Sequence, residues 1–363
     1  MKPLEKVISE FNIEGEVWSV APFGTGLIND TYLVETSGDA PDYVLQRINH
    51  RVFKDVEGMQ RNILAVSSHI RHKLEQACEK DVERKVLEFE TVGKSGKSFL
   101  YDGENYWRLS RLIPGAVTLQ EVTPSTARCA GMAFGRFQGM LADIREELTE
   151  SIPGFHNMEL RLLQLREAVE NDSVGRVADV GDLLDIISGH ESWMCEAEKL
   201  HREGKMPKRI CHCDTKVNNM LFDENGEVLC VIDLDTVMPS FVFSDYGDFL
   251  RTGACTTPED EPDIEKIDFD MSIFKAFSEG YMSEAGRFLT KSEIEWLPDS
   301  VALFPYMQAV RFLTDYINGD IYYKISYPEH NLVRTRTQLR LFQCVESLMP
   351  GIRSYIRELA SDI

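Results

Sequence analysis

The sequence predicts an α+β protein with two lobes, in which a small antiparallel β-sheet lobe with one helix precedes a larger, mainly helical lobe. Three observations support this prediction. The chain has 363 residues, a length that suggests about two domains. Short β-type runs separated by turns fill residues 1–112, and helical periodicity dominates after Pro124. We therefore expect a nucleotide-binding lobe at 1–112 and a catalytic and substrate-binding lobe at 113–363.

The strands of the small lobe are expected to form a meander, because short polar turns separate them. Their expected positions are 17–20, 31–35, 43–48, 86–92, 97–101 and 106–112. One helix interrupts them: Asp55 can cap it, and apolar residues then recur every three or four positions from Val56 to Leu74. The segment 93–98 resembles part of a P-loop, but it lacks the first glycine and joins two expected strands, so we interpret it as a turn.

The larger lobe shows helical patterns at 126–141, 158–171, 180–201, 270–283, 291–317 and 335–359. The first of these is rich in glycine and alanine, which permits close packing against another helix. The acidic, proline-bearing stretch 256–265 predicts an exposed loop.

Charge and hydropathy exclude several classes of partner. Lys plus Arg number 39 against 60 Asp plus Glu, for a net charge of -21, and no dense basic run compensates for it. Nucleic acids and anionic membranes are therefore poor partners. No apolar run reaches the roughly 18 residues of a membrane helix, and no signal-peptide core follows the first residues. We expect a cytoplasmic monomer or weak homodimer that binds small molecules.

The eight cysteines are scattered through apolar surroundings, as expected of reduced thiols rather than a disulfide framework. Cys211-His212-Cys213-Asp214 could suggest a zinc site. Structural zinc sites usually pair two such knuckles, however, and the sequence has no second one.

The most informative segment is 210–235. Asn225-Gly226 predicts a hairpin with a primed two-residue turn between strands at 220–222 and 228–232. A hairpin brings its two ends together. Asn219, just before it, and Asp233, just after it, are therefore expected to meet at one end and share one cation.

The residue types in this segment suit phosphoryl transfer. That reaction needs a carboxylate to accept the proton of the attacking hydroxyl, hard oxygen ligands for Mg²⁺, and a cation near the moving phosphoryl group. Asp214 fits the first role, Asn219 and Asp233 fit the second, and Lys216 fits the third. Asp214 and Lys216 are two residues apart, so they are expected to project to the same side.

Residues 212–219 follow the kinase catalytic-loop pattern H-R-D-x-K-x-x-N, although neither an Asp-Phe-Gly nor an Ala-Pro-Glu triplet follows. This loop, with Ile-Asp-Leu-Asp at 232–235, resembles the aminoglycoside phosphotransferase and choline kinase superfamily. Segments at 23–32, 43–49, 233–238, 244–248 and 310–320 make the chain most similar to N-acetylhexosamine 1-kinases. The resemblance implies a protein-kinase-like fold, ATP as phosphoryl donor and Mg²⁺ as cofactor.

The resemblance also implies a nucleotide site formed by a glycine turn, the third strand and the crossing between lobes. Its expected residues are Gly24, Thr25, Gly26, Asn29, Gln46, Arg47, Arg111 and Ile113. The third strand departs from the pattern, because Gln46 occupies the position of the usual phosphate-binding lysine. Either Gln46 and the glycine turn hold the phosphates, or Arg47 does so from the neighbouring position.

By the same resemblance, the acceptor site is expected to include Arg311 and Tyr322, and Asp30 and Asp235 are further candidates for it. A structural alternative for Arg311 is an ion pair with Asp315, one helical turn away. We expect Asp248 to be a buried residue that orients the catalytic loop, and His212 to be structural rather than catalytic.

The favoured interpretation is an ATP-dependent kinase that phosphorylates the C1 hydroxyl of N-acetylglucosamine or N-acetylgalactosamine. One alternative is another kinase of the superfamily, acting on a different sugar, an amino alcohol or an antibiotic. A further alternative is an inactive kinase fold that only binds ligands. Asp214, Asn219 and Asp233 are all present, which disfavours this last possibility.

Overall fold

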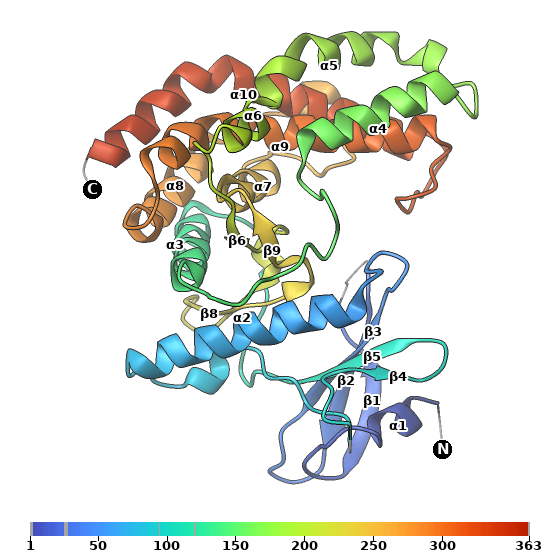
Figure 1. The fold of residues 1–363 in the computed structure, drawn as a ribbon, viewed down its shortest axis with the longest axis vertical. Helices are drawn as coiled ribbons and strands as arrows, with labels where there is room; N and C mark the ends of the chain where they lie inside the picture. Colours follow the sequence, from blue (N-terminus) through green and yellow to red (C-terminus); the bar gives the residue numbers. More distant parts are fainter. Residues whose placement is uncertain (1–2, 25–27, 94, 120, 362–363) are drawn as a thin grey trace. The chain divides into compact units, whose positions relative to one another are not determined.

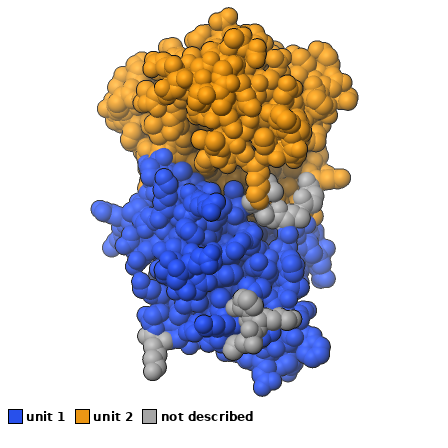
Figure 2. Space-filling model, turned by 90° about the vertical axis from the view of Figure 1, so that its right-hand side faces the viewer, with its two compact units in different colours: residues 1–118, 143–153, 220–238 blue, residues 119–142, 154–219, 239–363 orange. Residues whose placement is uncertain are grey.

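The computed structural model describes residues 3–24, 28–93, 95–119 and 121–361, and it contains two compact units (Figures 1 and 2). Unit 1 comprises residues 1–118, 143–153 and 220–238; unit 2 comprises residues 119–142, 154–219 and 239–363. Unit 1 is built on an antiparallel sheet and unit 2 is mainly helical, so the predicted α+β class is confirmed. The division of functions between lobes at 1–112 and 113–363 stays a prediction.

The sheet of unit 1 has five strands in the spatial order β1-β2-β3-β5-β4, with antiparallel neighbours throughout. The strands are β1 (Val17–Pro22), β2 (Asp30–Thr36), β3 (Tyr43–Ile48), β4 (Leu100–Tyr101) and β5 (Tyr106–Arg111). The prediction of a strand at 86–92 is wrong. The segment follows η1 (Val82–Arg84) and forms isolated bridges, because its partners change from β5 at Phe89 to Phe11 at Val92.

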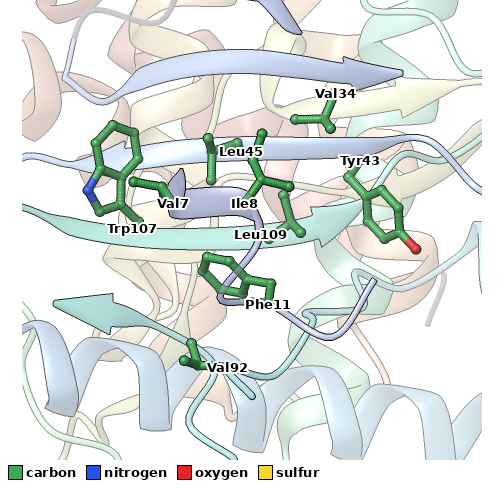
Figure 3. Packing of buried hydrophobic residues seen from close by; sticks show 9 residues of the cluster. All are labelled: Val7, Ile8, Phe11, Val34, Tyr43, Leu45, Val92, Trp107 and Leu109. Carbon is green, nitrogen blue, oxygen red and sulfur yellow. The ribbon is translucent and has the colours of Figure 1, made fainter. Parts of the chain in front are cut away.

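One face of this sheet is covered by α1 (Pro3–Ile8), a helix that the sequence pattern did not predict. Six residues make fewer than two helical turns, too few for an apolar stripe to be recognised. Figure 3 shows the side chains of α1 and of the turn after it against those of the strands. The cluster consists of Val7, Ile8, Phe11, Val34, Tyr43, Leu45, Val92, Trp107 and Leu109.

The register of β3 and β5 determines which residues lie on the other face. Leu45 pairs with Leu109, and Gln46 pairs with Arg108. Because side chains alternate along a strand, Gln46 and Arg108 lie on the face opposite to the cluster around Leu45.

Helix α2 (Val56–Gln76) begins as predicted, with the Asp55 side chain accepting a hydrogen bond from Gly58 N. Its buried Asn62 connects two other segments of unit 1. Asn62 Nδ2 donates to Thr149 O at 2.7 Å and to Val237 O at 3.0 Å, and Asn62 Oδ1 accepts from Thr149 N at 3.1 Å. The helix thereby holds the chain just after Asp233–Thr236.

The predicted hairpin is present as β7 (Met220–Phe222) and β8 (Val228–Val231). Its turn type is not the predicted one. A primed turn needs positive φ at its first central residue, here Asn225, but among residues 223–227 only Gly226 has a positive φ, at 83°. Asp223 determines the turn instead, because its Oδ1 accepts from the amides of Asn225 and Glu227 at 2.8 and 3.0 Å.

Unit 2 confirms the predicted helical lobe. Its helices are α3 (Pro124–Leu141), α4 (Met158–Asn171), α5 (Gly181–Met194), α6 (Glu196–Arg202), α7 (Phe243–Gly253), α8 (Met271–Ala285), α9 (Lys291–Ile317) and α10 (His330–Ser361). Short elements complete it, namely η2 (Val177–Asp179), β6 (Arg209–Cys211), η3 (Val217–Asn219), β9 (Met238–Ser240) paired with β6, and η5 (Ile264–Lys266). In the described part of the chain, no helix combines the length and apolar character needed to cross a bilayer.

Two helical predictions needed correction. The helix expected at 180–201 is two helices separated at Cys195, a one-residue interruption that periodicity does not reveal. Helix α7 was not predicted, although its apolar residues Phe243, Tyr246, Phe249 and Leu250 recur at helical spacing. The polar residues between them, Asp245 and Asp248 among them, are buried as well.

Helices α3 and α8 approach each other at three glycines, as the small residues of α3 predict. A Cβ on Gly131 would collide with Phe277 O and lie 2.7 Å from Tyr281 N, and one on Gly135 would lie 2.8 Å from Tyr281 O. Gly280 of α8 faces the backbone of α3 in the same way. Gly139, by contrast, would meet only the Phe288 ring, at 3.4 Å.

Gly131→Ala should therefore lower the free energy of unfolding by about 1–3 kcal/mol, because the added methyl group forces two backbones apart. Gly139→Ala is the matched control. It places the same methyl group in the same helix against a ring edge and should be neutral or stabilising by up to about 1 kcal/mol. Urea unfolding of both variants measures the difference. Equal stabilities would contradict the close-packing interpretation.

Candidate active site

The catalytic-loop motif lies between β6 and β7 and ends in η3. Its backbone is strained at Cys213, where φ is 63°. A left-handed conformation costs a non-glycine residue about 1–3 kcal/mol, so surrounding contacts must hold it in place. In this loop those contacts come from two buried carboxylates.

Asp245 and Asp248 of α7 bind the amides of the loop. Asp245 accepts hydrogen bonds from His212 N at 2.9 Å and Cys213 N at 2.8 Å, the two amides that lead into the strained residue. Asp248 accepts one from Thr215 N at 3.0 Å. The expectation that Asp248 orients the loop is confirmed, whereas the equal role of Asp245 was missed.

A second group of contacts fixes Asp245 itself. Gln138 Nε2 of α3 donates to Asp245 Oδ2 at 2.8 Å, and Tyr281 OH of α8 donates to Gln138 Oε1 at 2.6 Å. Burial raises the pKa of the Asp245 carboxyl, and hydrogen bonds from the loop and from Gln138 oppose that rise. Burial also raises the pKa of Asp248, against the charge of Arg251.

Asp214, the predicted base, is held on both sides. Lys216 Nζ lies 2.7 Å from Asp214 Oδ1, and Asn219 Nδ2 donates to Asp214 Oδ2 at 3.2 Å and to Asp214 O at 2.8 Å. The predicted common orientation of Asp214 and Lys216 is confirmed. Burial opposes ionisation, but the Lys216 charge and the bonds from Lys216 and Asn219 outweigh it, so the pKa of Asp214 is lowered.

His212 is fully buried, and its Nδ1 accepts a hydrogen bond from Asp214 N at 3.3 Å. The rings of Phe134 and Phe137 meet it edge-on at 5.8 and 6.0 Å. These contacts favour the predicted structural role.

The predicted magnesium ligands offer suitable donor atoms. Asn219 uses Nδ2 for its bonds to Asp214, which leaves the carbonyl oxygen Oδ1 as a hard ligand. Asp233 supplies a carboxylate in a left-handed conformation, with φ of 58°, directly before η4 (Leu234–Thr236). Asn219 belongs to unit 2 and Asp233 to unit 1, so their joint binding of one ion stays a prediction.

Asp235, expected at the acceptor site, has two partners within unit 1. Its Oδ1 forms an ion pair with Arg108, and its Oδ2 accepts from Asn29 Nδ2 at 2.7 Å. Arg108 Nε also donates to Gln46 Oε1 at 2.8 Å. The structure thus brings together three predicted site residues, Asn29, Gln46 and Asp235, around an arginine that was not predicted.

The other predicted residues of unit 1 lie apart from this network. Arg47 pairs with Asp30, with Nε to Oδ2 at 2.7 Å, and Arg111 pairs with Glu90 and Glu14. By strand alternation these three residues lie on the face covered by α1. Gly24 has φ of 76° and Ile113 is buried, whereas Thr25 and Gly26 lie outside the described residues. Their ligand-binding roles remain predictions.

Arg311 of α9 does not form the alternative ion pair with Asp315. Its Nη1 donates to Gln308 Oε1 at 3.0 Å, and its guanidinium lies over the rings of Phe155 and Tyr323, at 5.0 and 5.7 Å. Asp315 instead accepts the amides of residues 321–323 at 2.8–3.0 Å. These bonds fix the backbone around the exposed Tyr322. The ion pair between Arg311 and Asp315 that the sequence left open as an alternative is therefore wrong.

A second guanidinium, that of Arg161 in α4, lies near enough to Arg311 to be affected by its charge. Arg161 was not identified as a site residue from the sequence alone. Its side chain donates to Gly154 O, Phe155 O and Gln164 Oε1. In the described part of the chain, neither arginine has a carboxylate partner. Burial, followed by the charge of Arg311, lowers the pKa of Arg161 to about 10.

His156 lies within electrostatic reach of Arg161, Arg311 and the predicted base Asp214. Burial and then the charges of Arg311 and Arg161 lower its pKa, while Asp214 acts in the opposite direction. Its Nδ1 is buried without a hydrogen-bond partner. No local motif identifies Arg161 or His156, because 150 residues separate Arg161 from Arg311 in the chain.

The cysteines near the catalytic loop behave as buried thiols. Cys211 Sγ donates to Phe241 O at 3.3 Å, and burial raises the pKa of both Cys211 and Cys213. All eight cysteines are free of disulfides.

The sequence comparison identifies the class of protein. Residues 19–271 match the phosphotransferase enzyme family, which covers more than half of the chain. The protein belongs to this family.

Solved structures share its fold. An aminoglycoside phosphotransferase from Alicyclobacillus acidocaldarius is 12% identical with a TM-score of 0.62, over 98% of this chain and 96% of that one. A spectinomycin phosphotransferase, solved with ADP and spectinomycin, is 12% identical with a TM-score of 0.56, over 95% and 97%. A choline kinase from Streptococcus pneumoniae is 15% identical with a TM-score of 0.51, over 92% and 94%. The predicted kinase-like fold is confirmed.

The contact between Lys216 and Asp214 predicts a pH effect. Lys216→Met removes the positive charge that lowers the pKa of Asp214, so the carboxylate should protonate at higher pH. The acid limb of the kcat/KM profile should therefore move upward, with a loss of maximal rate as well. Steady-state kinetics across pH tests this, and an unmoved acid limb would contradict the coupling.

Proposed function

We propose that the protein transfers the γ-phosphoryl group of ATP to the C1 hydroxyl of an N-acetylhexosamine, either N-acetylglucosamine or N-acetylgalactosamine. The observation that carries the choice of acceptor is the pair of guanidinium groups, Arg161 and Arg311, that lack carboxylate partners among the described residues. Membership of the phosphotransferase family supports the reaction type. A neighbour of the same fold solved with ADP supports a nucleotide donor.

The residues of the loop divide the chemistry among them. Asp214 orients the C1 hydroxyl and accepts its proton as the oxygen attacks the γ-phosphorus. The new C1–O–P linkage forms while the bond to the β-phosphate oxygen breaks, and ADP leaves. Lys216 offsets negative charge on the phosphoryl oxygens. Mg²⁺, with Asn219 and Asp233 as its protein ligands, neutralises further phosphate charge when bound.

The two arginines favour a neutral acceptor over a cationic one. Choline and aminoglycosides are cations, and a site that contains unpaired guanidinium groups repels them. A sugar hydroxyl or an acetamido carbonyl, in contrast, accepts hydrogen bonds from a guanidinium fork. Phe155 and Tyr323, which already carry Arg311 on their faces, offer apolar surface for a sugar ring. The anomeric position and the acetamido group follow from the sequence resemblance.

A substrate panel tests this proposal. Both N-acetylhexosamines, glucose, choline, ethanolamine and spectinomycin should each be incubated with ATP and Mg²⁺, with ADP release as the readout. We expect turnover with at least one N-acetylhexosamine and a phosphate at C1 in the product by ³¹P NMR. No turnover with either one, or preferred turnover of a cationic acceptor, would refute the acceptor assignment.

Asp214→Asn should lower kcat by about 10²–10⁴-fold, because the amide cannot accept the proton. Calorimetric titration should still detect ATP binding in the presence of Mg²⁺, since the side chain keeps its size and its contact with Asn219. Wild-type turnover by this variant would show that another group acts as the base.

Arg311→Met should raise the KM for the N-acetylhexosamine by about 10- to 100-fold, the cost of losing charged hydrogen bonds. The KM for ATP should change little. Arg128→Met provides a matched control, because Arg128 is half-exposed on α3 and pairs with Glu279 at 2.7 Å. Equal acceptor KM values for the two variants would remove Arg311 from the acceptor site.

A further inference from the structure

The described strands and helices of unit 1 do not show, at the expected positions, the lysine and glutamate pair that kinases of this fold use beside the nucleotide phosphates. Gln46 occupies the position of the lysine on β3. The acidic residue near the start of α2, Glu57, is exposed and lies 3.7 Å from Lys97. A positive charge near Gln46 must therefore come from a different element.

Arg108 of β5 supplies a charge at this position. It lies directly opposite Gln46 in the strand register, and its side chain is 4% exposed. Among the described residues of β2, β3 and β5 on the face of Gln46, it is the one cation. Arg47 points to the opposite face, where it pairs with Asp30.

The contacts of Arg108 reach the turn that follows the predicted metal ligand, Asp233. Arg108 pairs with Asp235, which lies two residues after Asp233 within η4. Asn29 holds the second oxygen of Asp235 at 2.7 Å, and Asn62 of α2 holds Val237 O at 3.0 Å. The turn that follows Asp233 is thus attached to the sheet at Asp235 and to α2 at Val237.

This attachment constrains the backbone conformation at Asp233. Asp233 has φ of 58°, a conformation that costs about 1–3 kcal/mol and persists only when surrounding contacts enforce it. A buried ion pair such as Arg108–Asp235 contributes little net stability, because desolvation of both charges offsets their attraction. The ion pair is therefore better explained by the position in which it holds the turn after Asp233 than by the stability it adds.

We propose that Arg108 is a positioning residue for the metal–nucleotide site. Through Asp235 it keeps Asp233 in the left-handed conformation that presents the carboxylate to the metal, and beside Gln46 it supplies the buried charge that β3 lacks. This inference rests on the proposed use of ATP and Mg²⁺, but not on the identity of the acceptor.

The test uses the full chain and measures binding of ATP with Mg²⁺ by calorimetry, without any acceptor. Arg108→Met should weaken binding at least tenfold. Arg108→Lys keeps the charge but cannot bond Gln46 and Asp235 through one planar fork, so it should recover part of the affinity. Arg71→Met is the matched control: Arg71 of α2 pairs with Glu88 at 3.3 Å, and its loss should leave binding unchanged.

A double variant separates position from stability. Arg108→Met with Asp235→Leu replaces the buried pair by apolar groups, which should restore the unfolding midpoint that Arg108→Met alone lowers. Its affinity for ATP with Mg²⁺ should stay at least tenfold below that of the wild type. Wild-type affinity in either folded variant would overturn the proposal. Absence of binding by the wild-type protein would instead overturn the proposed function.

Discussion

The conformation of the catalytic-loop motif in unit 2 depends on the burial of the Asp245 and Asp248 carboxylates beneath it. Burying them is costly, as the raised pKa of each indicates, and the cost is offset by backbone amides that would otherwise lack partners. The loop and α7 therefore stabilise each other. With the backbone fixed on both sides of Cys213, the Asp214 side chain remains available for chemistry while its pKa is lowered by Lys216 and Asn219.

The arginines discussed above have different kinds of partner in the two units. In unit 1, Arg108 contacts both Asp235 and Gln46, so its charge joins the turn after Asp233 to β3. In unit 2, Arg161 and Arg311 make hydrogen bonds to neutral oxygens and contacts with aromatic rings instead. Under the proposed function, such positive charge disfavours a cationic acceptor and favours one that offers oxygen atoms. A protein with an overall net charge of -21 can therefore contain a locally positive site, because only nearby charges act strongly at short range.

Local spacing in the sequence was sufficient to predict the common orientation of Asp214 and Lys216 and most strands and helices. Asp214 and Lys216 project together because they are two residues apart, and long helices such as α9 have readable periodicity. The missed features depend on tertiary contacts. Asp245 reaches the loop from α7, 33 residues further along the chain, and the position of Arg108 beside Gln46 follows only from the strand register. The turn at Asn225-Gly226 was misassigned because the Asp223 side chain competes for its amides.

The glycines between α3 and α8 bear on how this enzyme can diverge. Gln138 of α3 and Tyr281 of α8 together hold Asp245, so the separation of the two helices determines where the support of the loop lies. Arg311 and Gln308 lie on α9, outside that pair of helices. Residues of α9, where the proposed acceptor contact Arg311 lies, can therefore be exchanged in related proteins while the α3–α8 spacing that supports the catalytic loop is inherited unchanged.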